Sequence, residues 1–233
     1  MKKFLLIFLI IIIYLIGNYV YFFDFLGQKH LAPPPHETKT LIGTHPGNRI
    51  IKYVALGDSL TAGVGASDYQ NSYPYLLAQK LSAQNNVELW NFSQSGARSD
   101  DVLTKQLPQA LSAKPNLVTL FIGINDIHGL KSLTEFKNNY NQIVSALQKN
   151  GAKVYLLSIP YLGSDKIVLF PYNLIWAART KQFNEAIKKA ALEYRAVYID
   201  LYPLTKSAQF YSADQFHPSD QGYKEWLKVI NVD

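Results

Sequence analysis

The sequence predicts a three-layer α/β/α fold with a five-stranded parallel sheet, preceded by an N-terminal transmembrane helix. Five short apolar runs alternate with segments of helical periodicity, which is typical of strands joined by crossover helices. The runs are continuously apolar, as expected for strands covered on both faces. With 233 residues, of which 48% are hydrophobic and 17% charged, the chain can fill one sizeable core.

The expected elements follow in order along the chain. In such a sheet with strand order 2-1-3-4-5, the ligand crevice forms at the carboxyl ends of the first and third strands, where the order reverses. The loops that follow the first three strands should therefore converge. Predicted strands cover 50–56, 87–92, 117–122, 153–159 and 196–200, and predicted helices cover 72–84, 99–111, 133–148, 173–194 and 219–229.

The N-terminal segment has the composition of a membrane span. Lys2 and Lys3 precede an apolar stretch over 4–23, long enough to cross the hydrocarbon core as a helix. Residues 19–24 resemble an aromatic interfacial belt and lack an Ala-x-Ala cleavage site, so an uncleaved anchor is preferred to a cleaved signal peptide, the lesser alternative. By the positive-inside rule, the rest of the chain should face the non-cytoplasmic side.

Residues 24–49 are expected to form a linker between this span and a domain over 50–233. The stretch carries Pro33-Pro34-Pro35 and little apolar periodicity, so a tether holding the domain off the bilayer is expected. Its histidines, at 30, 36 and 45, are irregularly spaced and do not predict a metal site. The absence of cysteine excludes disulfides and thiolate chemistry. The net charge is +6, but the lysines are scattered along the predicted helices. This distribution is typical of a solvated surface and does not predict a nucleic-acid partner. Oligomeric state is left open.

Ser59 is the candidate nucleophile. It ends the turn Gly57-Asp58-Ser59 directly after the first predicted strand, which would lift its hydroxyl to the rim of the sheet. A serine at such a turn more often only caps the following helix. The functional interpretation therefore depends on partners elsewhere in the chain.

The loops after the second and third strands supply candidate hydrogen-bond donors. Gly96 lets the backbone N–H approach a ligand, and Asn125 offers a side-chain donor. With the Ser59 N–H they would give three donors, as an acyl-transfer oxyanion requires. Each residue alone is more often a turn or a cap.

A serine nucleophile needs a base, and two histidines lie outside the linker. His128 follows Asn125 by three residues and would lie at the rim. His217 lies just before the last helix, with Asp214 three residues upstream to orient its Nδ1–H. His217 with Asp214 is therefore the preferred pair, and activity should fall on acidification because the base must be neutral.

These four segments, in this order, resemble the four blocks of the SGNH (GDSL) hydrolase family. The segments are Gly57-Asp58-Ser59-Leu60, Gly96, Gly123-Ile124-Asn125-Asp126 and Asp214-Gln215-Phe216-His217-Pro218. The resemblance implies a flavodoxin-like sheet and ester hydrolysis without cofactor or metal. It also implies Ser59 as nucleophile, His217 as base, Asp214 as its partner, and Ser59, Gly96 and Asn125 as oxyanion donors. Arg98 and Ser99 depart from the pattern, since relatives often carry a threonine or a second small residue there.

The substrate is less constrained by the sequence. The apolar loop 161–172 would either wall an acyl pocket or pack as core, and the tryptophans are expected to be core rather than sugar-stacking platforms. Three interpretations stay open. The leading one is an envelope-anchored esterase acting on O-acyl groups of a cell-surface glycan. The alternatives are a lipid-directed lysophospholipase or thioesterase and, from another class, a non-catalytic binding module. Acyl transfer is a variant of the first two.

Overall fold

The computed structural model describes residues 2–29, 31–161, 166–204 and 210–232. Their central feature is a six-stranded sheet of order β1-β3-β2-β4-β5-β6. The five strands from β2 to β6 are parallel and keep the predicted order 2-1-3-4-5. Their bounds lie within two residues of the predicted ones: β2 Ile50–Gly57, β3 Asn86–Asn91, β4 Leu117–Phe121, β5 Lys153–Leu157 and β6 Val197–Ile199.

The sixth strand, β1 (Lys39–Ile42), was not predicted, so the expected count of five strands is corrected to six. It pairs antiparallel with β3 at the edge of the sheet, and Lys39 forms an ion pair with Glu88 at 3.1 Å. Only four residues long and with alternate side chains exposed, β1 has no apolar run of its own. Its conformation depends on pairing with β3, which composition does not reveal.

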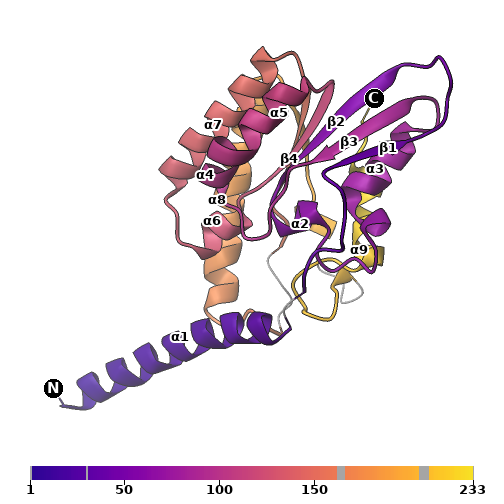
Figure 1. The fold of residues 1–233 in the computed structure, drawn as a ribbon. Helices are drawn as coiled ribbons and strands as arrows, with labels where there is room; N and C mark the ends of the chain where they lie inside the picture. The colour runs from indigo at the N-terminus through magenta and orange to yellow at the C-terminus, as the bar shows by residue number, and fades with distance from the viewer. Residues whose placement is uncertain (1, 30, 162–165, 205–209, 233) are drawn as a thin grey trace.

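Helices cover both faces of the sheet and produce the predicted three layers (Figure 1). One layer contains α3 and α9, and the other contains α5, α7 and α8. The bounds again follow the predictions: α3 Tyr73–Leu81, α7 Leu133–Lys149, α8 Tyr172–Glu193 and α9 Asp220–Val229. Short 3₁₀ turns lie at Tyr69–Asn71 and Tyr202–Leu204.

The predicted helix over 99–111 is divided into three pieces. A short α4 (Ser99–Asp101) leads into a π-helical turn, Val102–Gln106, and then into α5 (Leu107–Ala113). Pro108 lacks an N–H and therefore suits the first turn of a new helix. The π turn directs the buried Gln106 amide onto Gly57, where it accepts from the N–H at 2.9 Å and donates to the carbonyl at 2.8 Å.

Two short helices directly follow strands and lie outside the predicted helix ranges, although Ser59 was considered as the cap of a helix. These are α2 (Ser59–Ala62), after β2, and α6 (Ile124–His128), after β4. Each is barely one turn long, which is too short for helical periodicity to show in a sequence. Their N-termini lie where the strand order reverses, so they carry the candidate residues Ser59 and Asn125 to one edge of the sheet.

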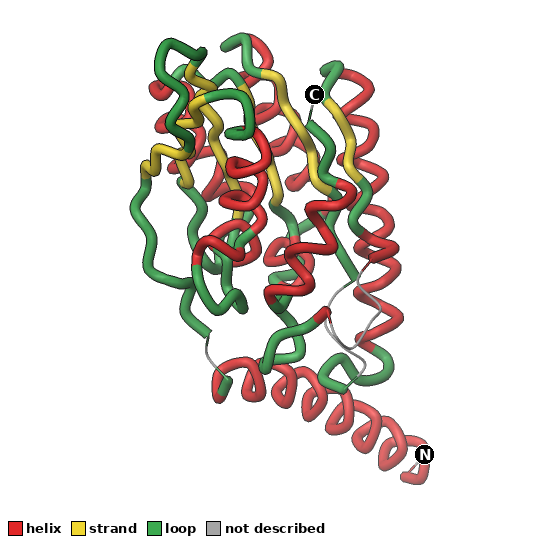
Figure 2. Tube along the Cα trace, turned by 90° about the vertical axis from the view of Figure 1, so that its right-hand side faces the viewer, coloured by secondary structure: helices red, strands yellow, loops and turns green. Residues whose placement is uncertain are grey.

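The apolar N-terminal segment forms α1 (Lys2–Gln28), a helix long and apolar enough to cross a membrane. Its first half projects from the domain, and its second half runs beneath the carboxyl ends of the strands (Figures 1 and 2). Phe22 is buried there against the domain. The stretch 24–49, expected to be a tether, thus contains the last turn of α1 and strand β1. Of its histidines, His36 stacks on Tyr69, His45 hydrogen-bonds the Ser82 carbonyl, and residue 30 lies outside the described residues.

Candidate active site

Ser59 occupies the first position of α2, where the end of β2 is tightly fixed. A Cβ at Gly57 would lie 2.2 Å from Thr61 Oγ1 and 2.3 Å from the Phe121 carbonyl oxygen, so only glycine fits. Asp58 caps α2 by accepting the Leu60 N–H at 3.0 Å. Ser59 therefore has a defined position at the rim, where its side chain lines a pocket.

Asp58 itself is buried and does not line this pocket. Burial raises the pKa of its carboxyl to about 7, although the Leu60 N–H opposes the shift. Its role in the described structure is to fix the start of α2 behind the serine.

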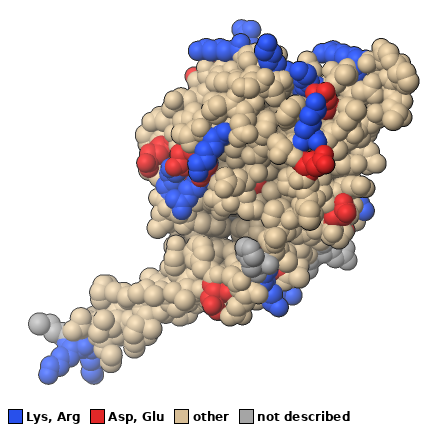
Figure 3. All heavy atoms as spheres, in the orientation of Figure 1, with Lys and Arg blue, Asp and Glu red and all other residues tan. Residues whose placement is uncertain are grey.

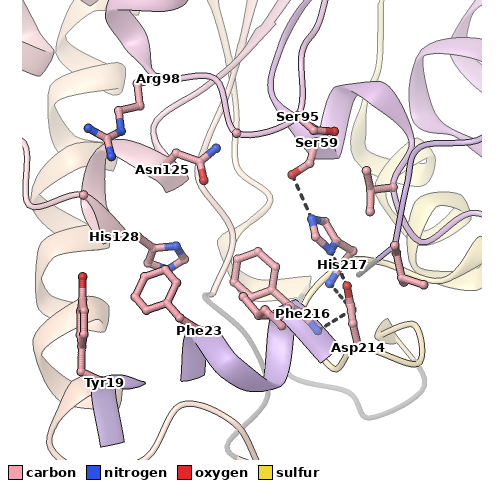
Figure 4. Close-up of a pocket in the computed structure, with 16 residues that line it drawn as sticks. Tyr19, Phe23, Ser59, Ser95, Arg98, Asn125, His128, Asp214, Phe216 and His217 are labelled. Carbon is pink, nitrogen blue, oxygen red and sulfur yellow. Dashed lines mark hydrogen bonds and ion pairs between the residues drawn. The ribbon is translucent and has the colours of Figure 1, made fainter. Parts of the chain in front are cut away.

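The loops after β3 and β4 meet beside Ser59. Gly96 lies in a turn closed by the Ala97 N–H donating to the Gln94 carbonyl at 3.0 Å, and its φ of +78° favours glycine. Asn125 Nδ2 donates to the Ala97 carbonyl at 3.0 Å and so joins the two loops. Both Gly96 and Asn125 line the pocket, as does Ser95 (Figure 4).

Buried hydrogen bonds between Ser99 and Asp126 hold these two loops together, and they were not predicted from the sequence. Both the N–H and the hydroxyl of Ser99 donate to the Asp126 carboxylate, and Asn139 donates to Ser99 Oγ at 3.1 Å. Burial raises the pKa of Asp126 in spite of these donors. Ser99, a departure from the family pattern, is therefore a support for the Asn125 loop, and Arg98 lines the pocket.

Ser59, His217 and Asp214 form one chain of hydrogen bonds, although 158 residues separate the serine from the histidine. His217 Nε2 lies 2.9 Å from Ser59 Oγ, and Nδ1 lies 2.5 Å from Asp214 Oδ2 (Figure 4). A carboxylate at Nδ1 keeps the proton there and leaves Nε2 able to accept one from a hydroxyl. The structure thus brings together the three residues that the sequence analysis selected.

The loop before α9 fixes the carboxylate of this chain. Asp214 Oδ1 accepts the N–H groups of Phe216 and His217, both at 2.9 Å, and the hydroxyl of Ser212 at 2.9 Å. Burial on its own would raise the pKa of Asp214. The hydrogen bond and charge of His217, with the two backbone donors, outweigh burial and hold the pKa below its usual value.

His128, the second candidate histidine, takes no part in the chain. It is buried among the rings of Phe22, Trp176 and Phe216, at centroid distances of 5.2, 4.5 and 5.5 Å. Burial, aided by the nearby His217, lowers the pKa of His128 to about 3. Its Nε2 has no hydrogen-bond partner among the described residues. His128 is therefore a neutral part of the pocket wall.

The pocket has a volume of about 550 Å³ and two chemically different walls. It opens between α1 and the rest of the domain, where the surface is hollowed (Figure 3). We call one side the polar wall, which consists of Ser59, Ser95, Gly96, Asn125 and His217, and the other the apolar wall, which consists of Tyr19, Phe23, Leu26, Gly27 and Leu31. The apolar wall was not predicted from the sequence, because lipid alone would account for an apolar helix at this position.

The loop 161–172 does not contribute to the pocket through its described residues, 161 and 166–172. Ile167 and Val168 are buried in the core, which agrees with the expectation that this loop packs as core. Leu169 and Phe170 are exposed beside α1. Residues 162–165 lie outside the described part of the chain.

Comparisons with known proteins agree with this geometry. The model of the GDSL-like Lipase/Acylhydrolase family matches residues 55–225. A lipase of Streptomyces rimosus is 44% identical over 85 residues, which are 32% of this chain and only 30% of that protein's length. The spore germination lipase LipC of Bacillus licheniformis is 26% identical over 208 residues, covering 78% of this chain and 95% of LipC.

Solved structures share the fold. TesA aligns with a TM-score of 0.64 at 22% identity, covering 77% of this chain and 95% of TesA. Axe2, an acetylxylan esterase of Geobacillus stearothermophilus, aligns with a TM-score of 0.59 at 20% identity, covering 81% of this chain and 93% of Axe2. The family match spans well over half of the chain, and the solved relatives have the same α/β architecture. The chain therefore belongs to the GDSL-like Lipase/Acylhydrolase family.

Proposed function

We propose that the chain hydrolyses carboxylic esters through a covalent acyl-enzyme on Ser59, with His217 as the base and Asp214 as its orienting partner. The observation that carries the proposal is the hydrogen-bonded chain from Ser59 Oγ through His217 to Asp214, which ends at the pocket. A non-catalytic binding module, the third interpretation, would have no need of an imidazole fixed in one tautomer against a hydroxyl.

The reaction would proceed in two steps. Ser59 Oγ attacks the ester carbonyl while His217 Nε2 takes the hydroxyl proton, and the resulting imidazolium returns a proton to the departing alcohol. Water, activated by the same imidazole, then attacks the acyl-enzyme and releases the acid. Another hydroxyl in place of water would give acyl transfer from the same intermediate.

The negative charge on the tetrahedral oxygen would be stabilised by the polar wall. The donors proposed are the backbone N–H groups of Ser59 and Gly96 and the side-chain amide of Asn125. Asn125 Nδ2 carries two hydrogens, and only one is needed for the Ala97 carbonyl. Each such donor typically contributes about 2.7–4 kcal/mol to lowering the barrier. Nucleophile, base and donors all come from this chain, so the proposed mechanism uses no metal or cofactor.

Two substrate classes follow from the sequence analysis, a glycan O-acyl group and a lipid ester. Axe2 is by its title an acetylxylan esterase, but its likeness to this chain is one of fold. Trp176 and Trp226 are buried in the core, and neither they nor Trp90 line the pocket. No tryptophan is therefore placed to stack on a sugar at the site. The apolar wall favours an ester with an apolar acyl group.

We also propose that α1 anchors the chain in a membrane, with the rest of the chain on the non-cytoplasmic side. The support is the length and composition of α1 and the position of Lys2 and Lys3 at its N-terminal end. A signal sequence is the lesser alternative.

The proposed function is tested by hydrolysis of p-nitrophenyl acetate and p-nitrophenyl decanoate by the full-length chain in detergent. Ser59→Ala should reduce turnover of both esters by about 10⁴-fold or more, since no other group supplies the nucleophile. Ser95→Ala is the matched control, because Ser95 lines the same wall outside the hydrogen-bonded chain. The assignment fails if Ser59→Ala keeps substantial activity or if Ser95→Ala abolishes it.

A further inference from the structure

The second half of α1 is packed against the domain, which a helix serving only as a membrane anchor would not require. Phe22, only 2% exposed, lies edge-on to Trp176 at a centroid distance of 4.7 Å and to Phe216 at 5.9 Å. Phe216 directly precedes His217, so this packing reaches the residue next to the proposed base. Burial of an apolar phenylalanine side chain is favourable, so this contact is preferred to exposure of Phe22.

Hydrogen bonds fix the rotation of α1 about its axis. The Tyr14 hydroxyl and Asn18 Nδ2 both donate to the Phe170 carbonyl, at 3.1 and 3.0 Å. Tyr172 donates from its hydroxyl to the Leu15 carbonyl at 3.1 Å. Because the rotation is fixed, a defined stripe of α1 faces the pocket. Its members are Tyr19 and the residues four, seven and eight positions after it, Phe23, Leu26 and Gly27.

The two walls suit the two ends of an ester. The polar wall places Ser59 and the proposed oxyanion donors where a carbonyl would bind, and the apolar wall lies opposite (Figure 4). An acyl chain extending from that carbonyl would cover the rings of Tyr19 and Phe23. The volume of about 550 Å³ is typical of sites that enclose a small amphiphilic ligand.

An exposed apolar surface lies beside the pocket. The side chains of Phe170, Leu174 and Ile175 are 60%, 61% and 44% exposed beside α1. The apolar side chains of the first half of α1 are also exposed. Such a continuous apolar surface is covered by lipid more favourably than by water. The nine helical steps from Tyr14 to Phe23 span about 14 Å. The pocket thus lies within one lipid length of this surface.

We propose that the end of α1, residues 19–27, is the acyl-binding wall of the active site and selects long-chain esters of membrane lipids. The proposal rests on the proposed ester hydrolysis at Ser59 and adds that the membrane helix itself determines which acyl groups are accepted. The lipid ester would present its carbonyl to Ser59 while its chain lies along α1 on the side nearest the bilayer.

The test uses the full-length chain in phosphatidylcholine vesicles and the ratio of kcat/KM for p-nitrophenyl decanoate to that for p-nitrophenyl acetate. Phe23→Ala removes part of the apolar wall at a residue that is 42% exposed, so folding should be retained. Gly27→Trp adds bulk to the wall, where a Cβ meets nothing within 4 Å. We expect each change to lower the ratio about tenfold: Phe23→Ala by the loss of an apolar contact, and Gly27→Trp by filling space that the longer acyl chain would occupy. Phe8→Ala, on the exposed part of the same helix, should leave both rates unchanged.

A membrane source is tested in the same vesicles with 1-palmitoyl-lysophosphatidylcholine, by the release of palmitate. The proposal predicts release that Gly27→Trp lowers and Phe8→Ala does not. It is overturned if Phe23→Ala and Gly27→Trp leave the ester ratio unchanged, or if decanoate is cleaved while palmitate is not released. Those outcomes would leave ester hydrolysis at Ser59 intact. Absence of any turnover that depends on Ser59 would instead overturn the proposed function.

Discussion

The two walls of the pocket are held in place by different forces. In the polar wall, the chain from Ser59 to Asp214 is fixed by hydrogen bonds to backbone N–H groups, and the strand before it ends at Gly57, where no other residue fits. The apolar wall is held by the packing of Phe22 and by three hydrogen bonds. Two of these run from side chains of α1 to the Phe170 carbonyl, and one runs from the Tyr172 hydroxyl to a backbone carbonyl of α1. Damage to the polar wall should therefore affect the chemical step, and damage to the apolar wall should affect the choice of ester.

The largest effect that separates the walls is expected from Asp214→Asn. An amide cannot stabilise the imidazolium and favours the wrong tautomer of His217, so kcat should fall about 10³–10⁴-fold for acetyl and decanoyl esters alike. The measurement is kcat for both esters, with circular dichroism to show that the chain as a whole remains folded. A change in the ratio of the two esters, with kcat preserved, would contradict the separation of roles.

The pH dependence of activity and of folding, measured on the unaltered chain, tests the same part of the polar wall. The pKa of Asp214 lies below its usual value, so its carboxylate stays ionised as the pH falls and its contribution to stability persists until the pH passes that lowered pKa. We therefore expect activity to fall on acidification before any loss of folding. Unfolding that coincides with the loss of activity would contradict this order.

A smaller effect on the same wall is expected from Asn125→Ala. Removing one of three proposed oxyanion donors should lower kcat about 10²–10³-fold, again without changing the preference between esters. Asn138→Ala, on the exposed face of α7, is the matched control. Equal kcat values for the two variants would remove Asn125 from the oxyanion site. The changes on the apolar wall, about tenfold in ester preference, are the smallest of the series.

Much of the fold was predictable because buried parallel strands leave a continuous apolar signal. All five residues of β4 are buried, and its predicted bounds differ from the observed ones by one residue. Strand β1 gave no such signal, because it depends on pairing with β3. The helices α2 and α6 are too short to show a period.

The polar wall could be predicted and the apolar wall could not, for a physical reason. Ser59, Gly96, Asn125, Asp214 and His217 follow strand ends, so the topology of the sheet brings them together wherever the loops allow. Phe22 and Phe23 are adjacent in a uniformly apolar stretch, yet one is buried and the other is 42% exposed. Periodicity cannot show which face of such a helix contacts protein and which contacts lipid. Ser99 was likewise hidden, because its role depends on the burial of Asp126.

Covalent labelling tests the central claim, that Ser59 is the nucleophile activated by His217, most directly. A p-nitrophenyl alkylphosphonate forms a stable adduct with an activated serine and mimics the tetrahedral intermediate. Mass spectrometry of the digested full-length chain should find one adduct, on the peptide that contains Ser59, formed far more slowly in His217→Ala. An adduct on Ser95, or labelling of Ser59 at the same rate in His217→Ala, would contradict the claim.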